Sequence, residues 1–318
     1  MTRSPGEVRF GVQLGRGRPD SLRTLAERIE ALGFDSIWVG DHVCFHTPTL
    51  DSLSVLTYVA AVTRRVRLGP CVYLLALRHP TVAAKTVATL DVLSGGRVVF
   101  GVGVGGEFPK EFEACGVPHA ERGPRVDEGI AVCRALWGPS PASFDGRFVR
   151  FADVTLEPKP LQPGGPPIWI GGRSDPALRR AARAGDGWVS YVVTPDRYRA
   201  SLEKIRTFAT AAGRSLDAGR GFEAAHLLFS VVDDDWTRAH ALAAQALSRQ
   251  YNQPFDELAK RYCLLGPPAR CVETLARFVE AGVRTFVLAF VAGAERFSGQ
   301  LERFAAEVLP SFRAGASS

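Results

Sequence analysis

Two polar residues, Asp41 and His42, follow directly after the short apolar segment 36–39. An imidazole beside a carboxyl group can bind a polar ring and can donate or accept a proton near neutral pH. A structural interpretation fits the pair equally well: Asp41 closes a turn and His42 is merely exposed. Position alone therefore leaves both interpretations open.

The alternation of His42, Cys44 and His46 raises the question of a metal site. Such a site needs a third or fourth ligand that the fold holds in place. The sequence contains no H-E-x-x-H or comparable cluster that would supply one. We therefore expect no metal.

A glycine-rich stretch, 101–106, satisfies the pattern G-x-G-x-x-G. In a dinucleotide-binding fold this pattern opens a helix, and an acidic residue closes the next strand about 20 residues later. Here Glu107, Phe108 and Pro109 interrupt the expected helix, and the acids near the right distance flank or enter a predicted helix at 124–137. Two interpretations remain: the glycines let the backbone approach a flat ring, or they permit close packing.

A second glycine pair occurs in the segment Gly171-Gly172-Arg173-Ser174. Ser174 or Asp175 can cap a helix whose first turn contains Pro176. The free backbone N–H groups at this helix start, together with Arg173, predict an anion site, and phosphate is the natural occupant. The alternative is simple helix capping beside a surface arginine.

The elements that must position these residues alternate between amphipathic helices and short, almost continuously apolar strands. Strands of this kind are buried on both faces, as in a parallel sheet. Three helix-to-strand loops contain a glycine where we expect the left-handed conformation: Gly33, Gly185 and Gly282. The predicted strands are 8–14, 36–39, 66–75, 98–104, 167–170, 187–193, 222–232 and 285–291.

Eight parallel strands with right-handed crossovers close most economically into a (β/α)8 TIM barrel, an α/β fold. A barrel of this kind usually takes about 250 residues, so the 318-residue chain has room for insertions. We assign these to 105–122, 139–167 and 248–268, and we expect one domain over residues 1–318. In such a barrel the active site lies at the carboxyl ends of the strands, where the polar and glycine-rich segments above are found.

The composition excludes several classes of function. The chain is 46% hydrophobic and 23% charged, which is ordinary for a globular protein, and its net charge of +6 is spread without a basic block. We therefore expect no nucleic acid as a partner. No apolar run is long enough to span a membrane and no secretory signal is evident, so we expect a cytoplasmic protein with no membrane contact and six free thiols.

The chain resembles the bacterial luciferase-like oxidoreductases, and its motifs are closest to the branch that uses the deazaflavin coenzyme F420. The resemblance runs from about residue 10 to residue 188 and thins toward the end of the chain. It is carried by Phe10-Gly-Val-Gln13, Trp38-Val-Gly-Asp-His42, Arg78-His-Pro80, Leu93-Ser-Gly-Gly-Arg97, Gly101-Val-Gly-Val-Gly105, Pro158-Lys-Pro160, Pro167-Ile-Trp-Ile-Gly-Gly172 and Ala184-Gly-Asp-Gly-Trp188.

The resemblance implies a role for each candidate residue. Asp41 and His42 lie at the cofactor ring, with His42 near the reacting carbon. A non-proline cis peptide at Cys71–Val72 forms a bulge behind the ring, Val104, Gly105 and Gly106 border the ring, and Gly171, Gly172, Arg173 and Ser174 bind the cofactor phosphate. One departure concerns the acid that some F420-dependent members carry directly after the Gly-x-Gly stretch. Here Gly106 stands there and Glu107 follows, which argues against a proton-transfer role for Glu107.

The resemblance thus implies an oxidoreductase that moves hydride between coenzyme F420 and a small-molecule substrate, acting as a homodimer. We favour F420 over FMN because the chain is short and lacks the long insertions of many flavin monooxygenases. Three alternatives remain: an FMN-dependent luciferase-like monooxygenase, a barrel that binds flavin without turnover, and an NAD(P)-dependent dehydrogenase on a doubly wound sheet.

Overall fold

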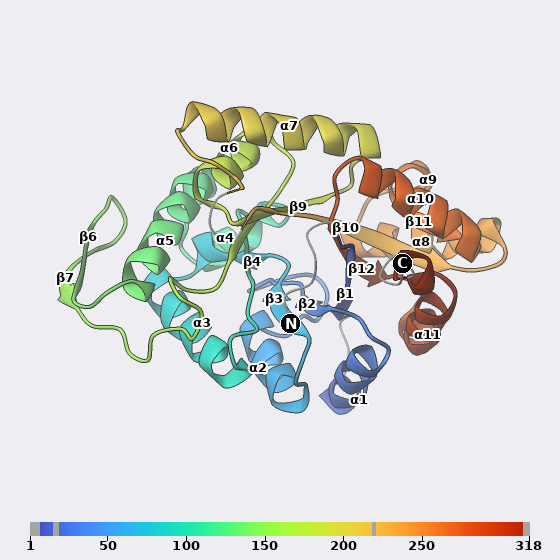
Figure 1. Cartoon of the computed structure of the whole chain (residues 1–318), viewed down its shortest axis with the longest axis horizontal. Helices are drawn as coiled ribbons and strands as arrows, with labels where there is room; N and C mark the ends of the chain where they lie inside the picture. The colour runs from blue at the N-terminus through green and yellow to red at the C-terminus, as the bar shows by residue number, and fades with distance from the viewer. Residues whose placement is uncertain (1–6, 15–18, 218–220, 314–318) are drawn as a thin grey trace.

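A closed ring of parallel strands forms the centre of the protein in the computed structural model, which describes residues 7–14, 19–217 and 221–313 (Figure 1). Each strand pairs with its neighbours in parallel, and Leu68 bridges to Val98 to close the ring. In order around the ring the strands are β3 (Arg67–Pro70), β2 (Ser36–Val39), β1 (Arg9–Leu14), β12 (Thr285–Phe290), β10 (Glu223–Val232), β9 (Gly187–Tyr191), β8 (Ile168–Gly171), β5 (Phe100–Gly103) and β4 (Tyr73–Leu74).

The predicted (β/α)8 TIM barrel is therefore confirmed. The predicted strand 66–75 is divided into β3 and β4 at the Cys71–Val72 peptide bond, which is cis as predicted. A doubly wound sheet has two open edges, whereas this sheet closes on itself. The doubly wound sheet of the NAD(P)-dependent alternative is therefore wrong.

Helices surround the ring and bury their apolar faces against it (Figure 1). None of the described helices is long and apolar enough to cross a membrane. The helices packed around the barrel are α1 (Pro19–Ala31), α2 (Ser52–Val62), α3 (Pro80–Ser94), α5 (Arg122–Trp137), α6 (Asp175–Ala184), α7 (Pro195–Ala211), α8 (Trp236–Tyr251), α10 (Pro268–Glu280) and α11 (Phe297–Glu307).

Each predicted insertion contains structure of its own. Segment 105–122 holds the short helix α4 (Pro109–Ala114), and segment 139–167 holds the antiparallel hairpin β6 (Ala142–Asp145) and β7 (Arg150–Val154), which projects from the barrel (Figure 1). Segment 248–268 holds α9 (Asp256–Tyr262) and β11 (Leu264–Gly266), and β11 pairs with the end of β10. Four 3-10 turns complete the described elements: η1 (Leu75–Leu77), η2 (His119–Glu121), η3 (Ala294–Arg296) and η4 (Leu309–Phe312).

The helix-to-strand glycines differ from one another. The left-handed conformation is confirmed at Gly33 and Gly282, whose φ angles are 84° and 107°. The same prediction is wrong for Gly185, whose φ is −84°. A Cβ atom at Gly185 would lie 2.9 Å from the carbonyl oxygen of Gly187 and 3.0 Å from that of Ala181. Space rather than backbone conformation therefore requires this glycine.

Two tryptophans fill the interior of the barrel. Trp38 and Trp169 stack at 5.0 Å between ring centroids, and both are almost completely buried. Gly69 makes room for Trp38, because a Cβ atom there would lie 2.6 Å from the indole. Gly187 does the same for Trp169, at 2.7 Å. These two side chains therefore fill the interior of the barrel at the level of Trp38 and Trp169.

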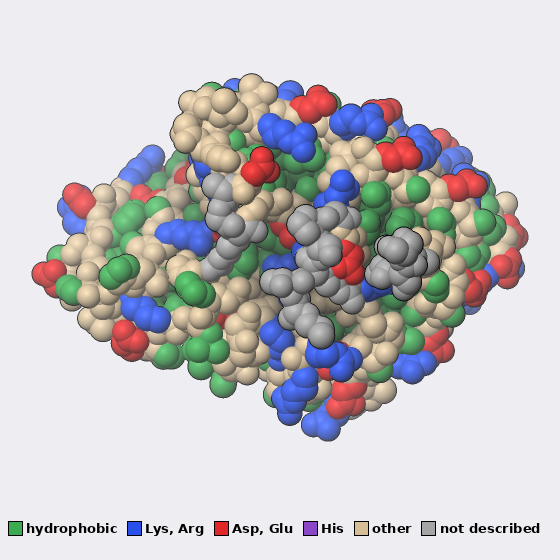
Figure 2. All heavy atoms as spheres, viewed as in Figure 1, with side chains coloured by type: hydrophobic (Ala, Val, Ile, Leu, Met, Phe, Trp, Pro, Cys, Tyr) green, Lys and Arg blue, Asp and Glu red, His purple; other side chains and the backbone are tan. Residues whose placement is uncertain are grey.

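The face viewed in Figure 2 carries Lys and Arg side chains interspersed with Asp and Glu. No extended surface of one sign is seen on this face. Mixed charge of this kind is typical of an ordinary solvated surface.

Candidate active site

A cavity of about 1120 Å³ lies at the carboxyl ends of the strands. Its position follows from its lining, which includes the last residue of seven strands: Leu14, Val39, Leu74, Gly103, Gly171, Tyr191 and Phe290. Ligand pockets for drug-sized molecules are about 300–1000 Å³, so this cavity has room for a large cofactor head and a small second molecule. Its floor is apolar and includes Val72, Val189 and Ala289.

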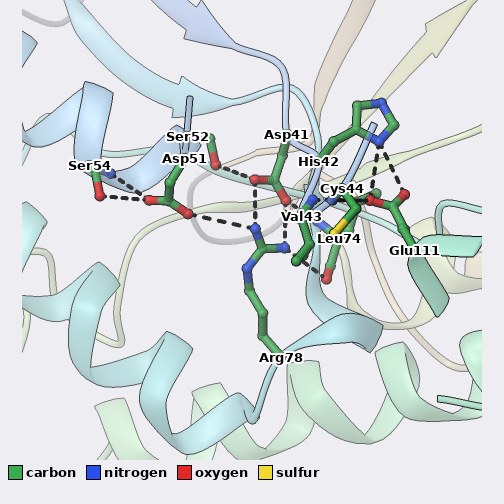
Figure 3. Close-up of polar contacts among 10 residues, drawn as sticks. All are labelled: Asp41, His42, Val43, Cys44, Asp51, Ser52, Ser54, Leu74, Arg78 and Glu111. Atoms are coloured by element: carbon green, nitrogen blue, oxygen red, sulfur yellow. Dashed lines mark hydrogen bonds and ion pairs between the residues drawn. The ribbon is translucent and has the colours of Figure 1, made fainter. Parts of the chain in front are cut away.

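The carboxylate of Asp41 is buried and holds together three segments that follow the strands (Figure 3). It accepts two bonds from the Arg78 guanidinium, at 2.8 and 2.9 Å. It also accepts the backbone N–H of Leu74 and the hydroxyl of Ser52, each at 2.9 Å. Burial raises the pKa of the Asp41 carboxyl, and the Arg78 guanidinium opposes that rise. Asp41 lines the cavity, but both of its oxygens are engaged in fixing the loop that carries His42.

The His42 imidazole lines the cavity and is held from one side by Glu111 of α4 (Figure 3). Its Nδ1 lies 3.1 Å from Oε1 of Glu111. The other oxygen of Glu111 accepts the backbone N–H of Val43 at 3.0 Å and that of Cys44 at 3.4 Å. The Glu111 side chain is only 1% exposed. Three converging donors and this burial make Glu111 a fixed acceptor.

The orientation of His42 decides which ring nitrogen can react. Because the Glu111 carboxylate only accepts hydrogen bonds, Nδ1 of His42 carries the proton of this bond, and in the neutral ring Nε2 then holds the lone pair. Phe45 stacks on the other side of the ring at 3.9 Å between centroids. Among the described residues none forms a hydrogen bond with Nε2. The site therefore offers one imidazole nitrogen, in a defined tautomer, at the wall of the cavity.

The other residues of the His42-x-Cys44-x-His46 pattern point elsewhere. Nε2 of His46 lies 2.9 Å from the carbonyl oxygen of Gln250, and Cys44 is exposed. In the described part of the chain no three His, Cys, Asp or Glu side chains group as metal ligands.

Four glycines of the two predicted cofactor-binding segments, 101–106 and 171–174, divide into two groups. A Cβ atom at Gly103 would lie 2.3 Å from Val72, and one at Gly171 would lie 2.7 Å from it. These two glycines therefore make room for the Val72 side chain, as the packing interpretation requires. Gly105 and Gly106 differ in their backbone conformation: all four glycines line the cavity, but only these two have positive φ angles, of 62° and 115°.

The left-handed backbone at Gly106 explains why no acidic residue stands there. A Cβ atom at Gly106 would lie 3.0 Å from Nε2 of His119 and 3.2 Å from Nε of Arg122. Glu107 accepts the hydroxyl of Tyr191 at 3.0 Å. Burial, with help from the Glu107 charge, raises the pKa of Tyr191 to about 12. Glu107 therefore ties the glycine segment to β9.

The predicted phosphate loop lies partly in the cavity wall. Gly171 and Gly172 line the cavity, whereas Arg173 donates to the carbonyl oxygen of Val192 at 2.8 Å and does not line it. Ser174 is the N-cap residue of α6, although its side chain makes no capping bond. The guanidinium that does line the cavity belongs to Arg122, at the start of α5.

Arg122 donates to the carbonyl oxygen of His119 at 2.8 Å and lies 3.0 Å from Nδ1 of the same residue. Nε2 of His119 is buried and has no hydrogen-bond partner among the described residues. Burial also raises the pKa of the Cys71 thiol to about 12, so this cavity-lining group stays protonated and is no thiolate nucleophile.

Sequence reasoning assigned no role to Glu111, Arg78 or Arg122. Arg78 stands in a motif that carried the resemblance, and its position before a helix gave no sign of the Asp41 contact. Glu111 and Arg122 belong to insertion 105–122, whose path no periodicity predicts. Only the folded chain brings these side chains to the site.

Comparison with known proteins agrees with this architecture. A family model described as luciferase-like monooxygenase matches residues 4–285. An F420-dependent glucose-6-phosphate dehydrogenase of Kineococcus radiotolerans is 29% identical over 326 residues, which cover 93% of this chain and 94% of that protein. An FMNH(2)-dependent dimethylsulfone monooxygenase of Pseudomonas putida is 30% identical over 273 residues, which cover 74% of this chain and 71% of that protein.

Among solved structures, an F420-dependent secondary alcohol dehydrogenase in complex with an F420–acetone adduct matches with a TM-score of 0.84. It is 23% identical and the match covers 96% of this chain and 99% of that one, so this likeness concerns the fold. The match of the family model extends over most of the chain and agrees with the barrel and with its cavity at the strand ends. The chain therefore belongs to the luciferase-like monooxygenase family of oxidoreductases.

Proposed function

We propose that this protein transfers hydride between coenzyme F420 and a small organic substrate, with His42 as the proton donor or acceptor. The proposal rests on the imidazole of His42, which lines the cavity. Its Nδ1 is held by Glu111, and its Nε2 has no hydrogen-bond partner among the described residues. Relatives named as F420-dependent, which align over more than nine-tenths of the chain, support F420 as the cofactor.

The residues around the cavity fit such a cofactor. One part of the cavity lining consists of the backbone of Val104–Gly106 and the small side chain of Val72. A flat ring can approach this surface closely because no large side chain stands in the way. The loop from Gly171 to Ser174 and the guanidinium of Arg122 are suited to an anionic group, since helix N-termini and arginine both favour phosphate. When bound, F420 supplies the ring carbon that takes or gives the hydride.

The protein's part in the reaction is proton transfer. As a substrate hydroxyl carbon gives up its hydride to the cofactor, the hydroxyl proton passes to Nε2 of His42 and the C–O bond becomes a carbonyl. In the reverse direction Nε2 returns the proton to the carbonyl oxygen. Glu111 stabilises the imidazolium that forms, and Asp41 with Arg78 holds the loop that carries the ring. The apolar floor keeps water from the reacting atoms.

Cofactor choice is tested by titrating the purified protein separately with F420 and FMN and following fluorescence. We expect F420 to bind at least tenfold more tightly. Tighter binding of FMN would favour the FMN-dependent monooxygenase, and bound reduced cofactor that no acceptor consumes would favour a non-catalytic flavin-binding barrel.

His42→Ala tests the proton-transfer role. General acid–base catalysis contributes about 100- to 10,000-fold, so we expect kcat to fall at least 100-fold while the Kd for the cofactor changes little. The exposed His79, which does not line the cavity, gives the matched control His79→Ala, with unchanged kcat. A histidine that only packs against the ring would instead lose affinity and keep its rate at saturation.

We further propose that the protein is a homodimer formed through α2 and α3. The two helices pack against each other, and α2 contains no charged residue. Their outer faces expose Tyr58, Val82 and Leu93, at 45%, 63% and 61%. Large exposed apolar side chains on neighbouring helices mark an interaction surface. Sedimentation analysis should show a dimer that Leu93→Arg converts to monomer, and a wild-type monomer at micromolar concentration would contradict the assignment.

A further inference from the structure

The walls of the cavity differ in charge. Six large side chains, from β1, β10, β12, α11 and position 50, form an apolar wall on one side, which we define as Leu14, Leu50, Leu227, Phe229, Phe290 and Phe297. Gln250 and Tyr251, at the end of α8, complete this side. None of the described lining residues on this side carries a charge.

Every charged group that lines the cavity among the described residues has a partner, and none belongs to the apolar wall. Asp41 is paired with Arg78, and Glu107 accepts the hydroxyl of Tyr191. Arg122 lies beside Gly106, in the glycine-rich segment that we assign to the cofactor. A charged or polyhydroxylated substrate against the apolar wall would therefore lose its hydration without gaining ionic partners, which is costly.

On this basis, and resting on the proposed function, we propose that the substrate is a neutral, mainly apolar molecule with a single hydroxyl or carbonyl group. The apolar wall contacts its hydrocarbon part, and the oxygen faces Nε2 of His42. In the oxidative direction the carbinol C–H bond breaks with its electron pair, which passes as hydride to oxidised F420. The O–H proton goes to His42, and the product is the carbonyl compound with the cofactor reduced.

A matched pair of substrates tests the charge preference. 2-Hexanol and 5-hydroxyhexanoate share the same secondary hydroxyl and carbon skeleton and differ by the terminal carboxylate. With saturating F420 we expect kcat/KM to be at least 30-fold higher for 2-hexanol. Equal values, or a preference for 5-hydroxyhexanoate or for glucose 6-phosphate, would overturn the assignment.

The length of the substrate tests the apolar contact. A buried methylene contributes about 0.8 kcal/mol, so kcat/KM should rise about threefold to fourfold per carbon from 2-butanol through 2-pentanol to 2-hexanol. A flat series would show that the hydrocarbon part stays in water and would refute the proposed contact.

Two exposed leucines give a variant and its matched control. Leu50 is 46% exposed and lines the cavity, whereas Leu161 is 57% exposed and does not. Neither change removes a buried side chain, so both variants should fold. We expect Leu50→Ala to lower kcat/KM for 2-hexanol about threefold to tenfold and Leu161→Ala to leave it unchanged. An unchanged value for Leu50→Ala would remove Leu50 from the contact surface.

A binding measurement separates this proposal from the proposed function. Calorimetry with the protein alone compares 2-hexanone with 5-oxohexanoate and requires neither F420 nor turnover. Tighter binding of 2-hexanone supports the neutral substrate class even if F420 fails to bind, and tighter binding of 5-oxohexanoate contradicts it even if F420 turns over. Since Arg16 and Arg18 lie outside the described residues, the R16A/R18A variant is measured in parallel, with the same preference expected.

Discussion

Glu111 is the residue whose replacement tests the arrangement of the site most directly. Its two oxygens serve different donors: Oε1 faces Nδ1 of His42, and Oε2 faces the backbone N–H of Val43. Glu111→Gln keeps the shape of the side chain but replaces one oxygen by an NH₂ group. Whichever way the amide turns, it directs an N–H group at a donor.

The structure sets the size of the effect. A hydrogen bond to a charged group contributes about 1.5–3 kcal/mol, and a factor of ten in rate corresponds to about 1.4 kcal/mol. If the imidazolium of His42 loses this stabilisation in the transition state, kcat falls by about 10- to 150-fold. The free energy of unfolding falls by a similar 1.5–3 kcal/mol, because one buried donor is left without an acceptor. The cofactor makes no contact with Glu111 in this assignment, so its Kd should change less than twofold.

Steady-state kinetics with 2-hexanol and F420, together with fluorescence titration of F420, measure these effects. Glu113→Gln is the matched control, because Glu113 is exposed on the same helix α4. His42→Ala/Glu111→Gln should be no slower than His42→Ala alone. Wild-type kcat in Glu111→Gln, or fully additive losses in the double variant, would refute the coupling.

Two further predictions concern the anion site and stability in acid. Arg122→Ala should weaken F420 binding by about 1–3 kcal/mol, which is the range for a charge-assisted hydrogen bond. Arg173→Ala should weaken it by the same amount if the phosphate reaches the start of α6. An unchanged Kd for F420 in either variant would show that this arginine does not bind the cofactor. Burial lowers the pKa of His226 to about 3, so the unfolded chain binds a proton below about pH 6.5 that the folded chain does not, and stability falls as the pH decreases from 6.5 toward 3. Urea unfolding should show a loss of about 2–3 kcal/mol between pH 6.5 and 4.5 that is absent in His226→Phe, and parallel pH slopes for the two proteins would contradict this.

The barrel was predictable because periodicity and burial constrain it strongly. Continuous apolar strands, amphipathic helices and loop glycines such as Gly33 and Gly282 all indicate the same alternation, and a parallel sheet of eight strands has few ways to close. Gly185 shows the limit of that reasoning, because the sequence reveals a glycine but not whether conformation or space requires it. The hairpin β6–β7 and the strand β11 were not predicted, since both lie in insertions where no regular pattern holds.

The site was predictable where it follows from the strands. Asp41 and His42 come directly after β2, and the fold places whatever follows a strand at the active end of the barrel. The hydrogen-bond partners of Asp41 and His42 were not predictable. Arg78 is 37 residues from Asp41 in the sequence, and Glu111 is 69 residues from His42. A motif fixes which residue types are present, whereas the tautomer of His42 depends on a contact that only packing creates.

Insertion 105–122 therefore determines more of the chemistry than its irregular sequence suggests. It supplies Glu111, which fixes the reactive nitrogen of His42, and Glu107 and Arg122, which lie beside the glycine-rich segment. The opposite side of the cavity comes from other strands and carries the apolar wall. In the proposed function, cofactor binding and proton transfer depend on one group of segments, and substrate selection depends on another. Substitutions in the apolar wall should accordingly change which substrate is accepted and leave F420 binding intact, whereas substitutions of Glu111 or Arg122 should reduce turnover of every substrate alike.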